Sequence, residues 1–284
     1  MNIGIKAFVG LVGCIGASMV AGFSAHAEGA SIKLYALDCG EIEMLDLGLF
    51  SREGKYDGQK NSAVDTCFLI RHPDGDMLWD TGLPEGLNAL PEGLINGPFH
   101  IKVPVKLTDQ LQELGMTPAD IEILSISHSH FDHVGNAGLF ARAKFVVNAN
   151  EYDHMFRDEA RADEQTFASY KALENAKTVK ITDRYDVFGD GSVEIIPTPG
   201  HTPGHSSLLV RLPNSGAVLL TGDMYHLTRA RELRTVPRFN TDPEQTLVSM
   251  DVFEDLAEIE SARVVIQHEK ADFQDFPKFP EYLD

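Results

Sequence analysis

The sequence predicts one α+β domain in which two central sheets lie between outer layers of helices, an αβ/βα four-layer sandwich. Strand-like and helix-like segments are mixed along the chain, as they are in layered domains of this kind. The chain has 284 residues, of which 43% are apolar and 24% charged, so a large hydrophobic core can form. It contains no repeat with a period of about 20–50 residues, which argues against a solenoid or a propeller.

The first 27 residues differ in composition from the rest of the chain. Lys6 is the only charged residue before Glu28, and residues 7–23 form an apolar stretch rich in Ala, Gly and Val. The stretch is short for a membrane span, and it is followed by Ala25-His26-Ala27, a pattern that signal peptidases accept. We therefore predict a cleavable signal peptide at residues 1–27, a mature domain at residues 28–284 and a periplasmic or secreted location.

The cysteines are interpreted in the light of this predicted export. Leu11-Val12-Gly13-Cys14 resembles a lipobox, so a lipoprotein anchored at Cys14 is a second interpretation of the leader, although the apolar run continues past Cys14. Cys39 and Cys67 remain in the mature chain, and an oxidising periplasm would permit a disulfide between them. Because sequence gives no geometry for such a bond, we expect two buried free thiols, with the disulfide as the alternative.

The chain is strongly acidic, with a formal net charge of -19. Such a surface repels polyanions, so nucleic acid and anionic membranes are poor partners. We expect no stable membrane association once the signal peptide is removed. A neutral or cationic small molecule suits this surface better than a phosphate-rich one.

The first half of the mature chain contains three strand-like runs before its first helix. Pro73-Asp74-Gly75 is a turn signal that joins the second and third runs into a hairpin. Residues 84–105 are rich in Pro, Gly and Leu, and this connection is too irregular for a helix. Apolar residues then recur at helical spacing over residues 107–115. The predicted strands are residues 32–37, 63–70 and 77–79.

The second half returns to strands and contains a long helix. Residues 121–126 form a β-branched run, whereas residues 151–177 are polar and favour helix. Asp242-Pro243-Glu244 predicts a helix start, because Asp is a good N-cap and Pro suits the first turn, and this helix extends to about Ser261. The other predicted strands are residues 144–148, 193–196, 207–212, 217–221 and 263–267.

A dense group of metal-binding side chains follows the run at residues 121–126. His128, His130, Asp132 and His133 place four potential ligands within six residues, on a loop that leaves a strand end. Neutral imidazoles and carboxylates are ligands that zinc prefers. His128 and His130 can bind one metal, while Asp132 and His133 can turn toward a second.

Three further segments can complete a two-metal site. The segment TPGHTPGH at residues 198–205, Asp223 and His268 each come directly after a predicted strand. All of them can therefore gather at one rim of a sheet sandwich. Two metals roughly 3.5–4 Å apart need a bridging ligand, and Asp223 is the natural carboxylate for this place.

Together with Trp79-Asp80-Thr81-Gly82, these segments resemble the metallo-β-lactamase superfamily over nearly the whole mature chain. The resemblance implies the metallo-β-lactamase fold and a site for two Zn2+ ions. His201 and His205 compete for one ligand place, and the resemblance favours His205, which leaves His201 to brace its loop by hydrogen bonding. By the resemblance, His128, His130 and His205 hold one zinc, Asp132, His133 and His268 hold the other, and Asp223 bridges them.

Local segments resemble one branch of the superfamily, the quorum-quenching N-acyl homoserine lactone lactonases. These segments are SHFDHVGN at residues 129–136, WDTGLP at residues 79–84 and FPEY at residues 279–282. Asp223 argues against lactam hydrolysis, because true β-lactamases of the superfamily lack the bridging aspartate. The resemblance implies that a metal-bridging hydroxide opens a lactone ring, with Asp132 carrying the proton to the departing alkoxide.

One position departs from that branch. Its well-known members carry a substrate-facing tyrosine three residues after the bridging aspartate, whereas this chain has His226 there and Tyr225 one residue earlier. Either His226 takes over the hydrogen bond to substrate or Tyr225 reaches in from a shifted loop. A third interpretation is that neither residue touches substrate.

An amphiphilic lactone, the small-molecule partner implied by the resemblance, needs an apolar channel for its acyl chain. Apolar residues of the 84–105 connection could line this channel. They could equally pack on the core or on a second subunit, so the sequence is compatible with a homodimer. These residues are Leu87, Leu90, Leu94, Ile95 and Phe99.

Other functions could use the same ligands. Glyoxalase II-like thioester hydrolysis needs a basic C-terminal helical extension, but this chain ends 16 residues after His268. Phosphodiester hydrolysis has one support, the arginines 229, 231, 234 and 238, which a solvated loop pairing with acids explains better. A zinc-binding protein that sequesters lactone without turnover is the non-enzymatic alternative, and the complete ligand set argues against it.

Overall fold

The computed structural model describes Met1 and residues 32–284. The predicted signal peptide and Cys14 lie outside the described residues. Within residues 32–284, no helix is both long enough and apolar enough to cross a membrane.

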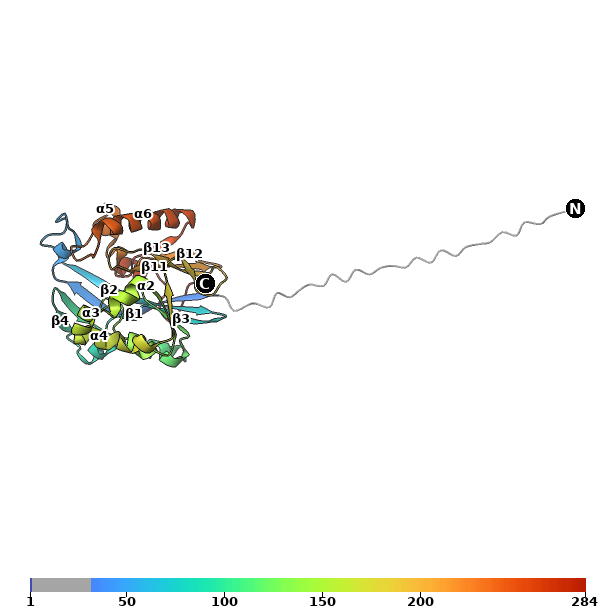
Figure 1. Cartoon of the computed structure of the whole chain (residues 1–284), viewed down its shortest axis with the longest axis horizontal. Helices are drawn as coiled ribbons and strands as arrows, with labels where there is room; N and C mark the ends of the chain where they lie inside the picture. The colour runs from blue at the N-terminus through green and yellow to red at the C-terminus, as the bar shows by residue number, and fades with distance from the viewer. Residues whose placement is uncertain (2–31) are drawn as a thin grey trace.

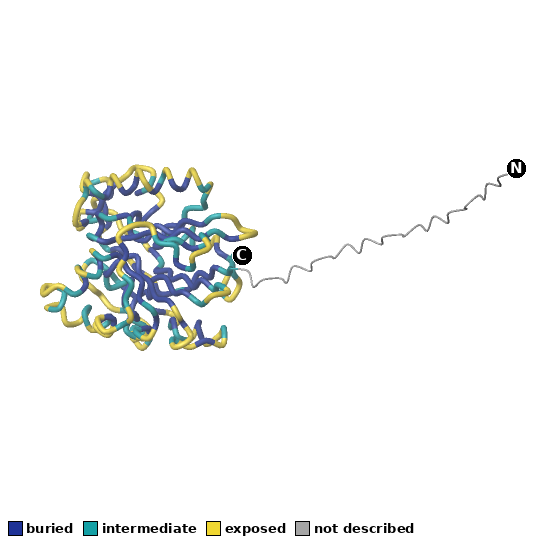
Figure 2. The backbone as a smooth tube through the Cα atoms, turned by 45° about the vertical axis from the view of Figure 1, so that its right-hand side comes forward, coloured by how far each residue is buried: buried dark blue, intermediate teal, exposed yellow. Residues whose placement is uncertain are grey.

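The described chain has the four layers that the sequence predicts. Two sheets pack face to face, α5 (Thr228–Leu233) and α6 (Pro243–Ile259) cover one of them, and shorter helices cover the other (Figure 1). Figure 2 shows the buried backbone concentrated in the central layers and the exposed backbone on the outer helices and loops.

The larger sheet uses residues 33–181 and has eight strands in the order β4-β5-β1-β2-β3-β6-β7-β8. Strands β3, β6, β7 and β8 run parallel, while the other pairs are antiparallel. The bounds are β1 (Lys33–Met44), β2 (Asn61–His72), β3 (Gly75–Trp79), β4 (Leu94–Asn96), β5 (Phe99–Lys102), β6 (Ile123–Ser125), β7 (Lys144–Asn148) and β8 (Thr178–Ile181).

The smaller sheet uses later residues and has five strands in the order β13-β12-β11-β10-β9. Its β12–β13 pair is parallel and the others are antiparallel. The bounds are β9 (Tyr185–Asp186), β10 (Val193–Pro197), β11 (Ser206–Leu212), β12 (Gly216–Leu220) and β13 (Arg263–Val265). Each sheet is therefore built from one half of the described chain.

The helices connect these strands. Helix α6 starts as predicted, with the Asp242 carboxylate accepting from the backbone N–H of Gln245 and Pro243 in the first turn. The other α-helices are α1 (Leu107–Glu113), α2 (Ala149–Met155), α3 (Asp158–Ala162), α4 (Glu164–Tyr170) and α7 (Lys270–Gln274). The 3-10 turns are η1 (Leu47–Phe50), η2 (Glu85–Ala89), η3 (Pro118–Asp120), η4 (Ala137–Phe140), η5 (Lys171–Asn175) and η6 (Gly222–Met224).

Alternation of side chains along the strands explains the packing of the layers. In β11, Leu208 and Val210 pack between the two sheets with Phe68 of the larger sheet, whereas Leu209 packs outward with Phe253 of α6. Successive side chains of a strand point to opposite faces, so a strand that is apolar at every position is buried on both sides. The continuous apolar run of β11 is what places it inside the sandwich.

The connection at residues 84–105 contains no α-helix, but it does contain short elements that the sequence did not predict. It contains η2 and the short strands β4 and β5, and β5 pairs with β1. Strands of three or four residues between Pro and Gly carry too few alternating positions to be recognised from sequence. Leu90, Leu94 and Ile95 are exposed, while Leu87 and Phe99 pack on a core cluster.

The expectation of free thiols is wrong, because Cys39 and Cys67 form a disulfide. The two cysteines lie on the paired strands β1 and β2, and the register of this pair shifts between Asp38 and Gly40. The shift brings Cys39 beside Cys67 with 5.8 Å between their Cα atoms, a separation that a disulfide can span. The bond is buried under α1 and α2 in the outer core of the larger sheet.

Candidate metal centre

Seven side chains that could bind metal ions meet at one rim of the sandwich. The larger sheet supplies four of them from the loop after β6: His128, His130, Asp132 and His133. The smaller sheet supplies the rest from the loops after β10, β12 and β13: His201, Asp223 and His268. The centre therefore lies between the two sheets.

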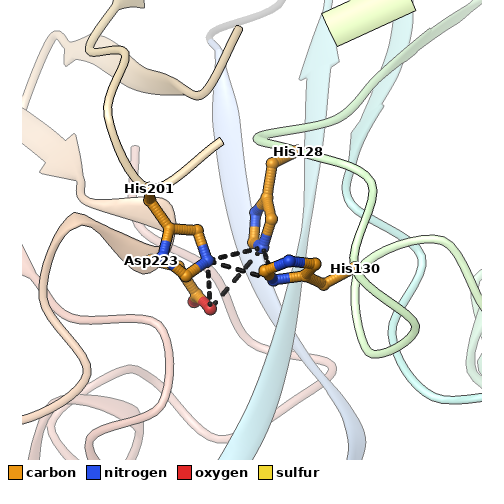
Figure 3. Close-up of side chains that lie close together, drawn as sticks. All are labelled: His128, His130, His201 and Asp223. Atoms are coloured by element: carbon orange, nitrogen blue, oxygen red, sulfur yellow. Dashed lines mark hydrogen bonds and ion pairs between the residues drawn. The ribbon is translucent and has the colours of Figure 1, made fainter. Parts of the chain in front are cut away.

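The first cluster contains three imidazoles and one carboxylate (Figure 3). His128 Nε2 lies 2.9 Å from His130 Nδ1 and 3.2 Å from His201 Nε2, and the His130 and His201 nitrogens are 3.0 Å apart. Asp223 Oδ2 lies 3.6 Å from His128 Nε2 and 3.4 Å from His201 Nε2. Around a tetrahedral zinc ion, ligand atoms are about 3.3–3.4 Å apart, so this cluster has the spacing of a metal site.

The second cluster contains Asp132, His133 and His268. Asp132 lies 4.0 Å from His133 Nε2 and 3.9 Å from His268 Nε2. The other carboxylate oxygen of Asp223, Oδ1, lies 3.2 Å from His133 Nε2 and 2.9 Å from His268 Nε2. Asp223 thus presents one oxygen to each cluster, which is the arrangement predicted for the bridging position.

The structure differs from the sequence prediction at one candidate ligand: His201, not His205, lies beside His128 and His130. His205 is fully buried, its Nδ1 donates to the carbonyl of Thr198, and its Nε2 accepts the backbone N–H of Asp223 at 2.9 Å. Both ring nitrogens are therefore engaged by the backbone. The repeat TPGHTPGH offers two similar histidines, and only the fold shows which of them faces the centre.

Hydrogen bonds fix the orientation of the ligand rings. His268 Nδ1 donates to the carbonyl of Val64, and His133 Nδ1 lies 3.0 Å from Asp80 Oδ2. His201 Nδ1 lies 2.8 Å from the Asn240 side-chain oxygen. A histidine that donates through one nitrogen presents a lone pair on the other, so each Nε2 is prepared to bind a metal.

Asp80 supports this arrangement from an unusual backbone conformation. Its φ is 59°, in the left-handed region, and its carboxylate accepts from the backbone N–H and the hydroxyl of Ser127 and from Gln267. Asp tolerates this region better than most residues, but the conformation still costs free energy. The hydrogen bonds to the loop after β6 offset that cost, which explains the Asp in the predicted WDTG segment.

Position 222 requires glycine for two reasons: its φ is 55°, and neighbouring side chains approach its backbone closely. A Cβ atom at this position would lie 2.6 Å from His205 Nε2 and 2.8 Å from Ser127 Cβ. Only glycine therefore lets η6 pass close enough for the N–H of Asp223 to reach His205.

The carboxylates of the centre favour a positive charge beside them. Burial alone would raise the pKa of Asp223, but His226, His133 and His268 hold it well below its usual range. Burial lowers the pKa of His128 well below its usual value, and His133 and His130 lower it further. Burial would also lower the pKa of His268, but Asp223 and Asp132 raise it to about 9. The two carboxylates thus favour a positive charge at His268, and a bound cation could supply that charge in place of the proton.

The donor set fits zinc. Asp223 Oδ1 is buried, and His133 Nε2 and His268 Nε2 face it at 3.2 and 2.9 Å, where a proton or a metal ion must lie between the lone pairs. Lone pairs that converge in a buried space repel each other unless a cation lies between them. Imidazole nitrogen and carboxylate oxygen are ligands of zinc, so the residues present match the metal that the sequence predicts.

His226 and Tyr225 occupy different environments. His226 lies in the wall of the site, with Nε2 2.9 Å from Asp223 Oδ2 and its ring against Phe50 and Phe239. The Tyr225 hydroxyl instead donates to Glu254 of α6, and its ring packs in the outer core of the smaller sheet. The interpretation that Tyr225 reaches the substrate is therefore wrong, because successive residues of this extended segment point to opposite sides.

A cavity of about 350 Å³ opens beside the centre. Its polar lining consists of the side chains of His130, Asp132, Asp223, His226 and His268. Its other walls are apolar, and Phe99 is the only one of the five apolar residues suggested for an acyl channel that lines it. The apolar walls are Ile42, Met44, Leu49, Phe50, Pro98, Phe99, Phe131 and Phe239.

Several residues that support the candidate ligands could not be predicted from the sequence. Asn240, Gln267 and Glu151 are buried and hydrogen-bonded to the ligands or their loops. Isolated Asn, Gln and Glu residues carry no spacing signal, so only the fold could reveal them. Three of the four arginines near Asp223 pair with acids as predicted: Arg231, Arg234 and Arg238 pair with Glu254, Asp251 and Asp57, whereas Arg229 lies over the ring of Tyr56.

Comparison with known families agrees with this geometry. Residues 64–268, which include every side chain of the two clusters, match the metallo-beta-lactamase superfamily. The chain belongs to this superfamily. The αβ/βα four-layer sandwich is the metallo-β-lactamase fold, and the chain is a metal-dependent hydrolase of that fold.

Similar curated proteins of the superfamily are N-acyl homoserine lactonases. AttM of Azorhizobium caulinodans is 31% identical over 262 residues, which cover 89% of this chain and 99% of AttM. AttM of Rhizobium radiobacter is 33% identical over 264 residues, covering 88% of this chain and 98% of that protein. AiiA of Bacillus thuringiensis subsp. kurstaki is 31% identical over 226 residues, covering 76% of this chain and 86% of AiiA.

Solved structures of the superfamily point the same way. An N-acyl homoserine lactone hydrolase with the product N-hexanoyl-L-homoserine bound at its catalytic metal center has a TM-score of 0.74 and 27% identity. The match covers 89% of this chain and 99% of that chain. A second quorum-quenching N-acyl homoserine lactone hydrolase has a TM-score of 0.75 and 28% identity, with 89% and 98% covered.

Proposed function

We propose that this protein is an exported N-acyl homoserine lactonase that uses two zinc ions. The cavity carries the proposal, because its polar lining belongs to or touches the candidate metal centre and the rest of its wall is apolar. Such a cavity suits a substrate with a polar reacting ring and an apolar chain. The lactonases among its relatives and structural neighbours support the same substrate class.

The residues that would hold the metals follow from the two clusters. His128, His130 and His201 would hold one zinc ion, and Asp132, His133 and His268 the other, with Asp223 between them. When bound, zinc supplies Lewis acidity, which polarises a carbonyl and lowers the pKa of water. Five of these residues are buried, whereas His130 and Asp132 are partly exposed and line the cavity.

Asp132 is placed to move the proton. It lines the cavity and its side chain keeps 14% of its surface exposed, more than the 4% of Asp223. Water adds to the lactone carbonyl, and Asp132 accepts a proton from it. The ring C–O bond then breaks, and Asp132 returns the proton to the departing alkoxide. The products are a carboxylate, a hydroxyl group and one released proton.

His226 is placed to orient the reacting group. Its ring packs edge-on against Phe50 and Phe239, which line the same cavity, so its position is restricted. A nitrogen donor in that wall can stabilise negative charge that develops on the carbonyl oxygen. We propose that His226 takes the hydrogen-bonding role of the tyrosine that the well-known lactonases carry at this position.

The disulfide supports the proposal of export. Cys39–Cys67 is buried between two paired strands, and disulfides persist in oxidising compartments such as the periplasm and the cell exterior. A mature protein that begins near residue 28 would keep both cysteines and lose Cys14.

The test is acid release at constant pH from N-acyl homoserine lactones of several chain lengths. We expect one proton per lactone opened, with faster turnover for acyl chains long enough to contact the apolar wall. A thioester and a phosphodiester run beside them distinguish the alternatives. Acid from the thioester alone, or stoichiometric loss of lactone without acid, would exclude the proposal.

Two variants provide matched controls for the same assay. His226→Phe keeps an aromatic ring against Phe50 and Phe239 but removes the nitrogen, so kcat should fall at least tenfold. Tyr225→Phe removes a hydroxyl that bonds Glu254 outside the cavity, so kcat should change less than twofold. Equal loss in both variants would argue against a substrate-facing role for His226.

A further inference from the structure

Glu151 is a fully buried carboxylate that contacts two of the loops carrying metal ligands. It lies in the first turn of α2, which begins at the end of β7 and is capped by the side chain of Asn148. It belongs to neither metal cluster and does not line the cavity. Its role therefore has to be found in its contacts.

Each carboxylate oxygen of Glu151 accepts two hydrogen bonds from a different loop. Oε1 accepts the backbone N–H of Ser129 at 2.8 Å and the Ser129 hydroxyl at 2.6 Å. Oε2 accepts the hydroxyl of Thr202 at 2.6 Å and the backbone N–H of Gly204 at 3.1 Å. Ser129 lies between His128 and His130, and Thr202 directly follows His201.

The loop after β10 packs directly on the backbone of α2. A Cβ atom at Gly204 would lie 2.0 Å from the Glu151 nitrogen, so no side chain fits there. The contact leaves little freedom for this loop to move relative to Glu151. The carboxylate thus joins a loop of the larger sheet to a loop of the smaller one, next to residues that carry His128, His130 and His201.

We infer that Glu151 is a positioning residue for the metal held by His128, His130 and His201. By fixing Ser129 and Thr202 to one rigid group, it sets the distance between the loop of His128 and His130 and the loop of His201. This inference rests on the metal centre proposed above but not on the lactone substrate. Outer hydrogen bonds of this kind commonly change metal affinity about 10–100-fold.

A carboxylate is the side chain that this position requires. All four contacting groups are donors, and a carboxylate offers acceptor sites on both oxygens. Glutamine has the same shape, but its NH2 group would face the donors of one loop. One loop would then lose its anchor while the other kept it.

The second cluster is held by different residues. Asp80 orients His133, and the carbonyl of Val64 orients His268. Neither contact involves Glu151, so loss of Glu151 should affect the two metal sites unequally.

The test measures zinc affinity of the folded protein by competition with a chromophoric chelator. We expect Glu151→Gln to weaken one of two binding events about 10–100-fold and to leave the other within twofold. Asp153→Asn, on the same helix but exposed and paired only with Lys180, should change neither. An unchanged affinity in Glu151→Gln, or equal weakening of both events, would overturn the inference.

A double variant shows which metal is affected. In a His201→Ala background the first site is already lost, so adding Glu151→Gln should leave the remaining affinity unchanged. If the second change weakened that affinity as strongly as in the intact chain, Glu151 would act on the fold in general. Should Glu151→Gln fail to fold, Thr202→Val removes a single hydroxyl contact, and a selective loss of at least threefold is expected instead.

Discussion

At the scale of single residues, the two histidines of the TPGHTPGH repeat have different tasks. His201 directs Nε2 to His128 and His130, whereas His205 directs Nε2 to the backbone N–H of Asp223. In the proposed centre, His201 would contribute a ligand atom, and His205 would hold the carboxylate of Asp223 in place. Burial and His201 lower the pKa of His205 to about 3, which keeps it neutral and able to accept that hydrogen bond.

Glutamine substitutions separate these two tasks, because a glutamine oxygen can accept a hydrogen bond but is a poor zinc ligand. We expect His201→Gln to lose about one of two bound metals and most of its turnover. His205→Gln should keep both metals, with activity reduced less than tenfold. Metal analysis of the purified proteins checks this, and retention of both metals in His201→Gln would contradict the assignment.

The sequence predicted six side chains that the structure brings together, and missed the seventh. His128, His130, Asp132 and His133 are close in sequence and follow one strand, so their spacing alone points to a metal. The choice between His201 and His205 depends on how a loop turns after β10, which no spacing rule gives. Likewise, neighbouring side chains of an extended segment point to opposite sides, but the sequence does not show whether Tyr225 or His226 is on the side of the cavity.

At the scale of elements, the long, strongly patterned segments were predictable and the short ones were not. Helix α6 has a cap, a proline and a long run, and β7 appears with the predicted bounds. Strands β4, β8 and β9 have two to four residues, too few to show a period. The register shift in β1 could not be predicted from the sequence either, and so the pairing of Cys39 with Cys67 was missed.

The disulfide joins β1 to β2 across 28 residues of sequence. Such a bond restricts the unfolded chain, so replacing both cysteines by serine should lower the free energy of unfolding by up to about 3–4 kcal/mol. Urea unfolding of the double variant measures this loss. Reducing agent should destabilise the natural chain similarly and leave the variant unchanged; two reactive thiols in the unreduced, unfolded natural chain would refute the bond.

At the scale of the whole molecule, each metal cluster draws side chains from both sheets. His128 and His130 of the larger sheet meet His201 of the smaller, and His133 meets His268 in the same way. Metals bound there would connect the two layers of the sandwich directly. Binding to the folded state alone stabilises a protein by mass action.

Removing the metals should therefore lower the melting temperature of the whole protein. A metal present at one hundred times its Kd adds about 2.7 kcal/mol to the free energy of unfolding. The loss of two metals should therefore lower the melting temperature measurably. Dialysis against a chelator followed by the melt tests this, and added zinc should restore the original transition. A melt that does not shift after the metals are gone would show that the sheets need no such connection.

The division of the chain between the two sheets has a consequence for how the enzyme could be taken apart. The larger sheet ends at Ile181 and the smaller begins at Tyr185, so a single cut near Asp183 separates the two layers. The fragment before the cut would carry four ligands of the centre and the fragment after it three. Neither fragment could form a complete cluster alone, so metal binding would measure the association of two separately produced fragments.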